Sequence, residues 1–268
     1  MMNKLNINCT WDLDFEMFHE KKIELFVDFH NVNKVLGKNV IKILFILEPP
    51  EIAPAFTNMA ISRQREFDFI LTHNQEILDK CKNAILFEFG TTWIKEPYSF
   101  TKKKFEVSTL VGGKLMAPGH HLRQKLWYKE NKIKTPKRFF ISGNMHGNLQ
   151  NFNNNPLLGN KKEPLFNSQF HIVIENVKRK NWFTEKLIDC LYTKTVPIYY
   201  GCPNIENYFD TDGMFLVNSV DEIISVCNSL DENTYLEKLK YVEKNYELSK
   251  EFVNIKARLK KTIKKILK

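Results

Sequence analysis

The stretch that most constrains the fold spans residues 170–208, FHIVIENVKRKNWFTEKLIDCLYTKTVPIYYGCPNIENY. Phe170–Ile174 is a short apolar run that ends in two β-branched residues, which predicts a buried strand. Thr184 is a suitable N-cap for a helix that we expect to run to about Lys194. Val196–Tyr200 predicts the next strand. The order strand, polar loop, helix, strand indicates one βαβ unit, with its polar groups gathered on one edge.

The polar residues on that edge indicate a site for an anion. Glu175 and Asn176 follow the first strand, where open α/β sheets place their ligands. The helix N-terminus carries a partial positive charge, and Lys186 adds a full one. Because Glu175 and Glu185 would repel a bare phosphate but can accept from hydroxyls, a sugar nucleotide fits better. The alternative is an ordinary helix that begins with a capping Thr and a Glu-Lys pair.

The string IEN–WFTEKLIDC–VPIYYGCPNI resembles the signature of glycosyltransferase family 10, the α-1,3/4-fucosyltransferases. The spacing from Glu175 to Lys186 is intact, and weaker similarity extends from about Lys42 to Asn245. Trp182 stands where the family usually has Tyr, and Ile174 where Phe is common. The first departure removes a hydroxyl donor but keeps a ring for stacking.

The first part of the chain repeats a strand–helix pattern. Near-continuous apolar strands with polar ends are typical of a parallel sheet that is buried on both faces, so we expect a Rossmann-like half. The expected strands are Leu5–Cys9, Ile23–Phe29, Ile41–Leu47, Phe67–Leu71 and Ala84–Phe87.

Glu48 ends one of these strands and is followed by two prolines. The prolines stop the strand and hold the backbone, which is a good setting for a general base. In the resembled family a Glu in such a loop deprotonates the acceptor hydroxyl, and Glu48 matches it. Glu51 is the nearby rival, and a surface carboxylate in a proline turn is the alternative without function.

The second half is expected to begin after a Pro-, Ser- and Lys-containing linker at residues 91–104. The strand Phe105–Val111 leads into Gly-Gly-Lys114, a weak phosphate-binding signal because neither the P-loop nor the GxGxxG spacing is present. Arg123 follows on a helix whose apolar positions face inward. The resemblance implies that Arg123 grips the donor diphosphate, a role that suits its forked guanidinium.

No residue pattern predicts a metal centre. The histidines lack the spacing of a zinc site, and we expect surface or capping roles for them. Asp210-Thr211-Asp212 is a D-x-D sequence followed by Gly213, which favours a turn over a nucleotide-bound metal. The cations would neutralise the diphosphate, so no metal or other cofactor is expected.

The charge and cysteine patterns restrict the environment and the partners. Five scattered cysteines without a C-x-x-C pair favour a reducing compartment. The formal net charge is +9, but residues 250–268 hold eight Lys or Arg against one Glu, so the rest of the chain lacks the basic face of a nucleic-acid-binding protein. This tail predicts a basic amphipathic helix that either contacts an anionic membrane or packs one stripe onto the domain. We expect a cytoplasmic protein, peripheral at the membrane surface if the tail binds there.

Together these inferences predict an α/β, GT-B-like fold of two facing Rossmann-like domains: residues 1–98 for the acceptor and base, 99–245 for the donor, and 246–268 as the basic helix. The resemblance implies an inverting α-1,3-fucosyltransferase-like enzyme, which transfers fucose from GDP-fucose to a glycan or glycolipid. In it Glu48 would be the base and Glu175 would lie near the positive charge of the sugar. Two alternatives remain: a related enzyme with another nucleotide-sugar donor, and a non-catalytic nucleotide- or glycan-binding relative. The expected donor-binding residues are Lys114, Arg123, Asn176, Trp182, Thr184, Glu185 and Lys186.

Overall fold

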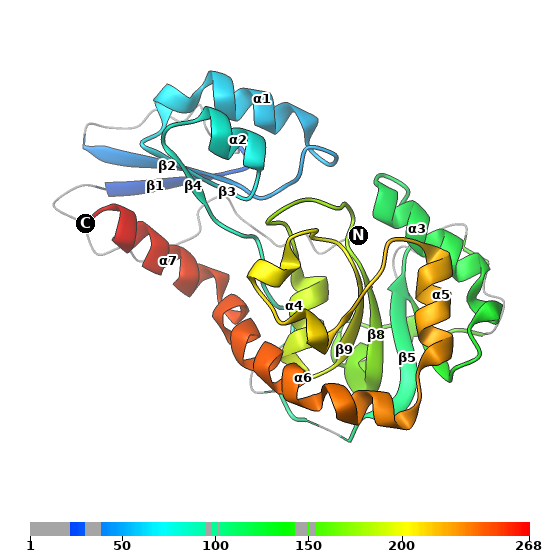
Figure 1. Cartoon of the computed structure of the whole chain (residues 1–268). Helices are drawn as coiled ribbons and strands as arrows, with labels where there is room; N and C mark the ends of the chain where they lie inside the picture. The colour runs from blue at the N-terminus through cyan, green and yellow to red at the C-terminus, as the bar shows by residue number, and fades with distance from the viewer. Residues whose placement is uncertain (1–21, 30–38, 95–97, 101, 143–148, 151–153) are drawn as a thin grey trace. The chain divides into compact units, whose positions relative to one another are not determined.

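The computed structural model describes residues 22–29, 39–94, 98–100, 102–142, 149–150 and 154–268 (Figure 1). The chain divides into two compact units. The first contains Met1–Phe89, Lys180–Trp182 and Asn254–Lys268, and the second contains Gly90–Arg179 and Phe183–Val253. The division therefore falls earlier than the expected boundary at residue 98, and the C-terminal segment belongs to the first unit.

The first unit contains a parallel sheet of four described strands in the order β1-β2-β3-β4. The strands expected from residue 23 onward are confirmed, with small shifts of their ends. The run Leu5–Cys9 lies outside the described residues. The strands are β1 (Lys22–Val27), β2 (Val40–Ile46), β3 (Phe69–Thr72) and β4 (Ala84–Leu86), and the helices between them are α1 (Pro54–Ser62), η1 (Gln64–Glu66) and α2 (Gln75–Lys80).

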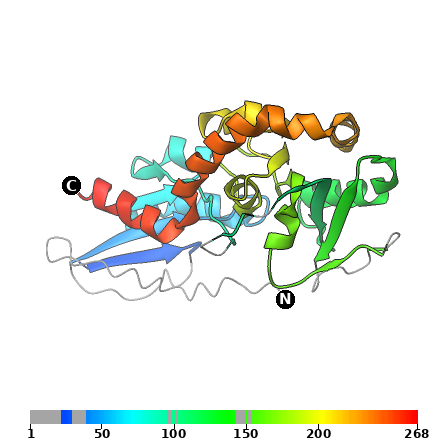
Figure 2. The ribbon, with the colours of Figure 1, turned by 90° about the horizontal axis from the view of Figure 1, so that it is seen from below.

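The C-terminal helix α7 (Ile255–Ile266) completes the core of the first unit. Leu259 and Ile263 are fully buried and pack in one cluster with the strand residues Ile43 and Phe45. Figure 2 shows α7 in red alongside the blue strands. Of the two alternatives for this tail, the packing of one apolar stripe onto the domain is therefore confirmed, and contact with an anionic membrane is not shown. No helix of the described chain is long and apolar enough to cross a bilayer.

The second unit is a six-stranded parallel sheet in the order β10-β9-β8-β5-β6-β7. When the six strands are numbered along the chain, this is the doubly wound order 6-5-4-1-2-3. Successive strands are added on one side of β5 up to β7 and on its other side from β8 onward, so the strand order reverses between β5 and β8. The strands are β5 (Lys104–Val111), β6 (Lys137–Ser142), β7 (Leu157–Leu158), β8 (Ser168–Ile174), β9 (Val196–Tyr200) and β10 (Phe215–Leu216). The helices are α3 (Pro118–Tyr128), η2 (Glu130–Lys132), η3 (Glu163–Asn167), α4 (Glu185–Tyr192), η4 (Ile205–Asn207), η5 (Thr211–Gly213), α5 (Val220–Ser229) and α6 (Glu232–Val253).

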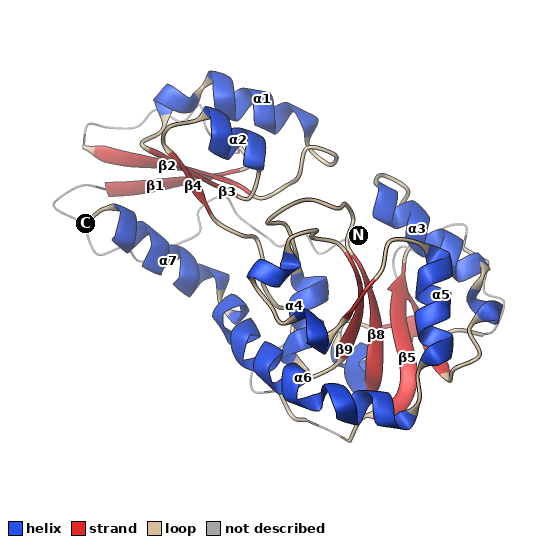
Figure 3. Cartoon of the chain, viewed as in Figure 1, coloured by secondary structure: helices blue, strands red, loops and turns tan. Residues whose placement is uncertain are grey.

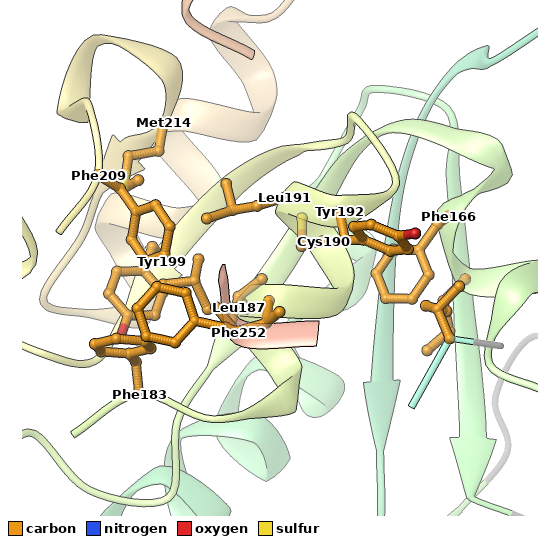
Figure 4. Packing of buried hydrophobic residues seen from close by; sticks show 14 of the residues in the cluster. Phe166, Phe183, Leu187, Cys190, Leu191, Tyr192, Tyr199, Phe209, Met214 and Phe252 are labelled. Carbon is orange, nitrogen blue, oxygen red and sulfur yellow. The ribbon is translucent and has the colours of Figure 1, made fainter. Parts of the chain in front are cut away.

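Strand β8 separates two hydrophobic clusters because its side chains alternate between the faces of the sheet. Phe170, Ile172 and Ile174 pack on the face of α3 and α5, whereas Val173 packs on the face of α4. Figure 3 shows these helices on either side of the strands. The cluster on the α4 side is rich in aromatic rings, among them Phe183 at 5.2 Å from Phe252 between centroids (Figure 4). Strand β8 is therefore held in place by hydrophobic packing on both faces of the sheet.

Two sequence expectations in this unit receive a structural explanation. Asp210-Thr211-Asp212 forms a turn, in which the Asp210 carboxylate accepts from the Asp212 backbone N–H at 3.1 Å and from Lys244 Nζ at 2.7 Å. The turn interpretation is confirmed. The expected helix at residues 246–268 is two helices, α6 and α7, separated at Asn254, whose side chain caps α7 by accepting from Ala257 N.

Candidate functional site

The candidate site lies at the carboxyl ends of β5 and β8, where the strand order reverses. In doubly wound sheets this is the position at which ligands bind. The N-terminus of α3 approaches β8 closely here, since Gly119 N donates to Asn176 O at 2.8 Å. A side chain at Gly119 would collide with the backbone carbonyl of Glu175. Glycine is therefore required for this close approach.

The Glu175 carboxylate joins the end of β8 to the start of α4. It accepts from Thr184 N at 2.8 Å and from Thr184 Oγ1 at 2.8 Å, and its side chain is 0% exposed. Burial raises its pKa above the ordinary value, against the opposing effect of Lys186. We expected Glu175 beside the positive charge of the sugar, and in this structure both of its carboxylate oxygens accept from Thr184. Glu175 is thus a residue that positions the helix N-terminus.

Thr184 caps α4 as predicted. Its Oγ1 accepts from Lys186 N at 3.3 Å while its hydroxyl donates to Glu175. The Lys186 ammonium also contacts this oxygen at 3.1 Å. One threonine thus connects the buried carboxylate, the helix N-terminus and the lysine.

Glu185 and Lys186 form an ion pair in the first turn of α4. Lys186 Nζ lies 2.9 Å from Glu185 Oε1 and 3.8 Å from Glu175 Oε2. Burial alone would raise the pKa of Glu185, but Lys186 outweighs it and lowers that pKa; in the same way Glu185 and Glu175 outweigh burial and raise the pKa of Lys186. Both groups are therefore ionised at neutral pH. The Lys186 side chain is 29% exposed, whereas the Glu185 side chain is mostly buried, with 11% exposed.

Arg123 reaches the same edge from α3. Its guanidinium donates to Ile174 O, the last residue of β8, and to Asn176 Oδ1 at 2.6 Å. Burial lowers the pKa of Arg123 to about 10, against the attraction of Glu175 and Glu185. Arg123 is close enough to Lys186 for its charge to oppose the rise in the pKa of that lysine. The structure thus brings together Arg123, Asn176, Thr184, Glu185 and Lys186, as the sequence predicted.

Lys114 and Trp182 differ in their placement. Lys114 lies in the loop after β5 and is close enough to His120 to lower the pKa of that ring. Trp182 belongs to the first unit and is 3% exposed, with its ring centroid 6.2 Å from that of His73. The stacking surface expected at Trp182 is therefore covered by protein.

Two charged residues on this side of the sheet were not predicted. Asp189 lies one turn after Glu185 on α4, and its Oδ1 accepts from Thr92 Oγ1 at 2.6 Å and from Trp93 N at 2.8 Å. Burial raises the pKa of Asp189 to about 7. The Lys162 ammonium lies 5.1 Å from the centre of the Trp93 ring and is attracted by Glu185 and Asp189. The sequence could have indicated Asp189, because it lies four residues after Glu185 on the same predicted helix. Lys162 lies in an Asn-rich stretch in which no motif marks it as a functional residue.

Glu48 lies at the carboxyl end of β2 in the first unit and its side chain is exposed. Its turn is held by the buried Asp28, which accepts from Leu47 N at 2.8 Å and from Glu48 N at 3.4 Å. His73 Nε2 contacts the Leu47 carbonyl oxygen at 3.0 Å on the other side. The predicted rigid setting of Glu48 thus rests on side chains of two neighbouring loops as well as on the prolines.

The residues that the structure describes include no group of three or more His, Cys, Asp or Glu side chains arranged to hold a metal ion. The described cysteines, Cys81, Cys190, Cys202 and Cys227, are free and buried.

No family model matches the chain. The chain is 33% identical over 85 residues to the Alpha-(1,3)-fucosyltransferase FucT of Helicobacter pylori, a match that covers 30% of this chain and 18% of that enzyme. The match thus spans less than a fifth of the curated relative.

Solved structures match over most of the chain. An α1,3-fucosyltransferase with GDP matches with a TM-score of 0.51 and 16% identity, over 86% of this chain and 77% of that one. TarM matches with a TM-score of 0.59 and 14% identity, over 90% and 54%. An alpha-glucosyltransferase in complex with UDP-glucose and DNA matches with a TM-score of 0.59 and 11% identity, over 92% and 80%. The chain therefore has the α/β fold with parallel sheets that is found in GT-B glycosyltransferases.

Proposed function

We propose that this protein is an inverting glycosyltransferase that transfers fucose from GDP-fucose to a hydroxyl group of a glycan or glycolipid, in the manner of an α-1,3-fucosyltransferase. The observation that carries the proposal is the convergence of Arg123 and Lys186 at the edge where the strand order reverses. Two cations beside a helix N-terminus are suited to a diphosphate. The partial match to the Helicobacter pylori enzyme supports fucose as the sugar.

The reaction is one displacement at the anomeric carbon. Glu48 takes the proton of the acceptor hydroxyl as its oxygen forms the new bond, and the bond between the anomeric carbon and the diphosphate oxygen breaks. GDP departs with the electron pair of that bond. Arg123 and Lys186, together with the partial positive charge at the start of α4, stabilise the charge that grows on the leaving group. The cations of the chain take the role that a divalent metal has in other transferases, so activity is expected to persist in EDTA.

Glu185 is the carboxylate that we assign to the sugar. Its side chain keeps 11% of its surface exposed and Lys186 favours its ionised form, whereas the Glu175 side chain is fully buried behind Thr184. An ionised carboxylate at this place can accept from a sugar hydroxyl and attract the positive charge that develops on the ring. Asn176, which Arg123 orients, is assigned to the ribose or phosphate side of the donor.

Calorimetry with GDP tests the donor site. We expect Lys186→Ala to weaken GDP binding by tenfold or more, since a charge-assisted contact is worth about 1.5–3 kcal/mol. Arg123→Lys keeps the charge but cannot hold both Ile174 O and Asn176 Oδ1, so it should also weaken binding. Lys178→Ala is the matched control, because this exposed lysine of the same loop contacts Asn218. Equal affinity in all three variants and the wild type would contradict the site.

A related transferase that uses another nucleotide sugar is the second candidate. Trp182 lacks the hydroxyl of the Tyr that the resembled family usually has at this position, and it is covered by protein, which favours this candidate. Thermal shift with GDP-fucose, other GDP-sugars and UDP-sugars separates these candidates: the true donor should raise Tm most. Release of free sugar from that donor would exclude a non-catalytic binding protein.

A further inference from the structure

The imidazole of His120 has a defined proton position in this structure. His120 is the third residue of α3, and its Nδ1 lies 3.0 Å from the backbone N of Ala117, the N-cap of that helix. A backbone N–H can only donate, so Nδ1 must be the acceptor and carry no proton. In the neutral ring the proton is therefore on Nε2. Nε2 makes no hydrogen bond to any residue in the described part of the chain and is not among the buried polar atoms sealed from solvent.

His120 lies at the donor edge. The preceding residue, Gly119, is hydrogen-bonded to Asn176 O and abuts the Glu175 carbonyl. The titratable groups around the ring come from three directions: the cation Arg123 and the imidazole of His121 from α3, the cation Lys114 from the loop after β5, and the cation Lys186 from α4. Two carboxylates lie at the same edge: Glu185 on α4 pairs with Lys186, and Glu175, which follows β8, accepts from Thr184.

This setting keeps the ring uncharged. Burial and the neighbouring cations, Arg123 first among them, lower the pKa of His120 to about 4. A histidine of ordinary pKa would change charge near pH 6.5, whereas this ring stays a neutral N–H donor across the physiological range. The cations that suppress its protonation are the same ones that would attract an anion.

We propose that His120 is a further donor-binding residue, whose neutral Nε2–H donates a hydrogen bond to an oxygen of the diphosphate held by Arg123 and Lys186. The inference rests on the proposed function, since it names another contact of the same site. A neutral donor adds a directed hydrogen bond without further repulsion among three cations, which explains why a histidine held in one tautomer stands here. The competing role is purely structural: capping of α3 through Nδ1.

The substitution His120→Asn separates these roles. The Asn side-chain oxygen lies near the place of Nδ1 and can still accept from Ala117 N–H, but nothing replaces the Nε2–H. His120→Ala removes both. His121→Asn is the matched control, because this neighbouring side chain is exposed. GDP and inorganic pyrophosphate are the two probes, so a wrong choice of nucleoside does not obscure contact with the diphosphate.

We expect His120→Asn to bind both probes about tenfold more weakly than the wild type at unchanged Tm, the loss expected for one hydrogen bond to a charged group. His121→Asn should bind like the wild type. If His120→Asn keeps wild-type affinity for both probes, the inference is overturned while the proposed donor site stands. If the wild type binds neither probe, the proposed function fails, and this inference with it.

Nitrogen NMR of the wild-type imidazole provides a test that does not depend on how the variants fold. The free protein should show the Nε2–H form of His120 with no titration between pH 5.5 and 8. Saturation with pyrophosphate should shift the Nε2 resonance and leave the Nδ1 resonance nearly unchanged. An unmoved Nε2 resonance in the saturated protein, or a proton on Nδ1, would overturn the assignment.

Discussion

Glu175 and Thr184 are joined by two hydrogen bonds, one from the threonine backbone N–H and one from its hydroxyl, each of 2.8 Å. The residue after β8 thereby fixes the residue before α4. Because Lys186 also contacts Thr184 at 3.1 Å, the position of the lysine depends on this connection. The fully buried Glu175 carboxylate thus supports the start of α4 from beneath.

The change Glu175→Gln should lower stability more than it alters chemistry. The new amide NH₂ would face either the Thr184 backbone N–H, which is a donor, or Thr184 Oγ1, which already accepts from Lys186 N and Lys186 Nζ. One buried hydrogen bond is therefore lost and a donor remains unsatisfied, at a cost of about 1–3 kcal/mol. Denaturant unfolding at neutral pH measures this loss. Glu185→Gln is the comparison: we expect a larger fall in turnover and a smaller fall in stability. The reverse ranking of the two variants would show that Glu175, rather than Glu185, contacts the sugar.

Substitution of Glu48 tests the assignment of the base. Glu48→Gln keeps the turn, because the contacts of Asp28 are to backbone N–H groups, but it cannot accept the acceptor proton. We expect GDP affinity to stay within a factor of two or so and kcat to fall by about 10²-fold or more. Initial rates at saturating donor measure the effect. Glu51→Gln is the matched control on the same loop; a fall in rate for Glu51→Gln alone would transfer the role to Glu51.

Asp189 makes stability depend on pH in a defined direction. Its pKa is about 7 in the folded protein against 3.8 for the ordinary side chain, so between these values the folded state binds the extra proton. The stabilisation from this group is complete below about pH 4 and is lost as pH rises through about 7. Asp189→Asn keeps the acceptor oxygen for Thr92 and Trp93 but cannot ionise.

We therefore expect the unfolding free energy of Asp189→Asn to rise relative to the wild type as pH increases from 4 to 7, by about 1.4 kcal/mol for each pH unit inside the window. Parallel denaturation series of both proteins check this slope. Identical slopes would mean that Asp189 is ionised throughout the window.

The apolar stripe of α7 should matter for the stability of the first unit. Leu259 is fully buried against the sheet, so Leu259→Ala should cost about 2–5 kcal/mol through lost burial and the cavity that it leaves. Thermal unfolding reports the loss. Lys264→Ala, on the exposed side of the same helix, should leave Tm nearly unchanged. A stable Leu259→Ala variant would indicate that α7 does not pack on the sheet in solution.

The sequence by itself determined the local elements and the chemistry of the donor edge. The apolar run Phe170–Ile174, the cap Thr184 and the strand Val196–Tyr200 were all predictable, because strand periodicity and N-cap chemistry depend on neighbouring residues. The same local logic placed Glu175, Asn176 and Lys186 on one edge.

Only the tertiary structure decided which of these groups face outward. Glu175 and Glu185 are the same residue type, and their roles differ because one is enclosed by Thr184 and the other is paired with Lys186 at the rim. Contacts between distant segments decide the rest. They cover Trp182, bury Leu259, and bring Asp189, His120 and Lys162 to the site. Such contacts join segments that are far apart in the chain, and the pattern of one segment, such as the apolar stripe of α7, does not identify the segment that covers it.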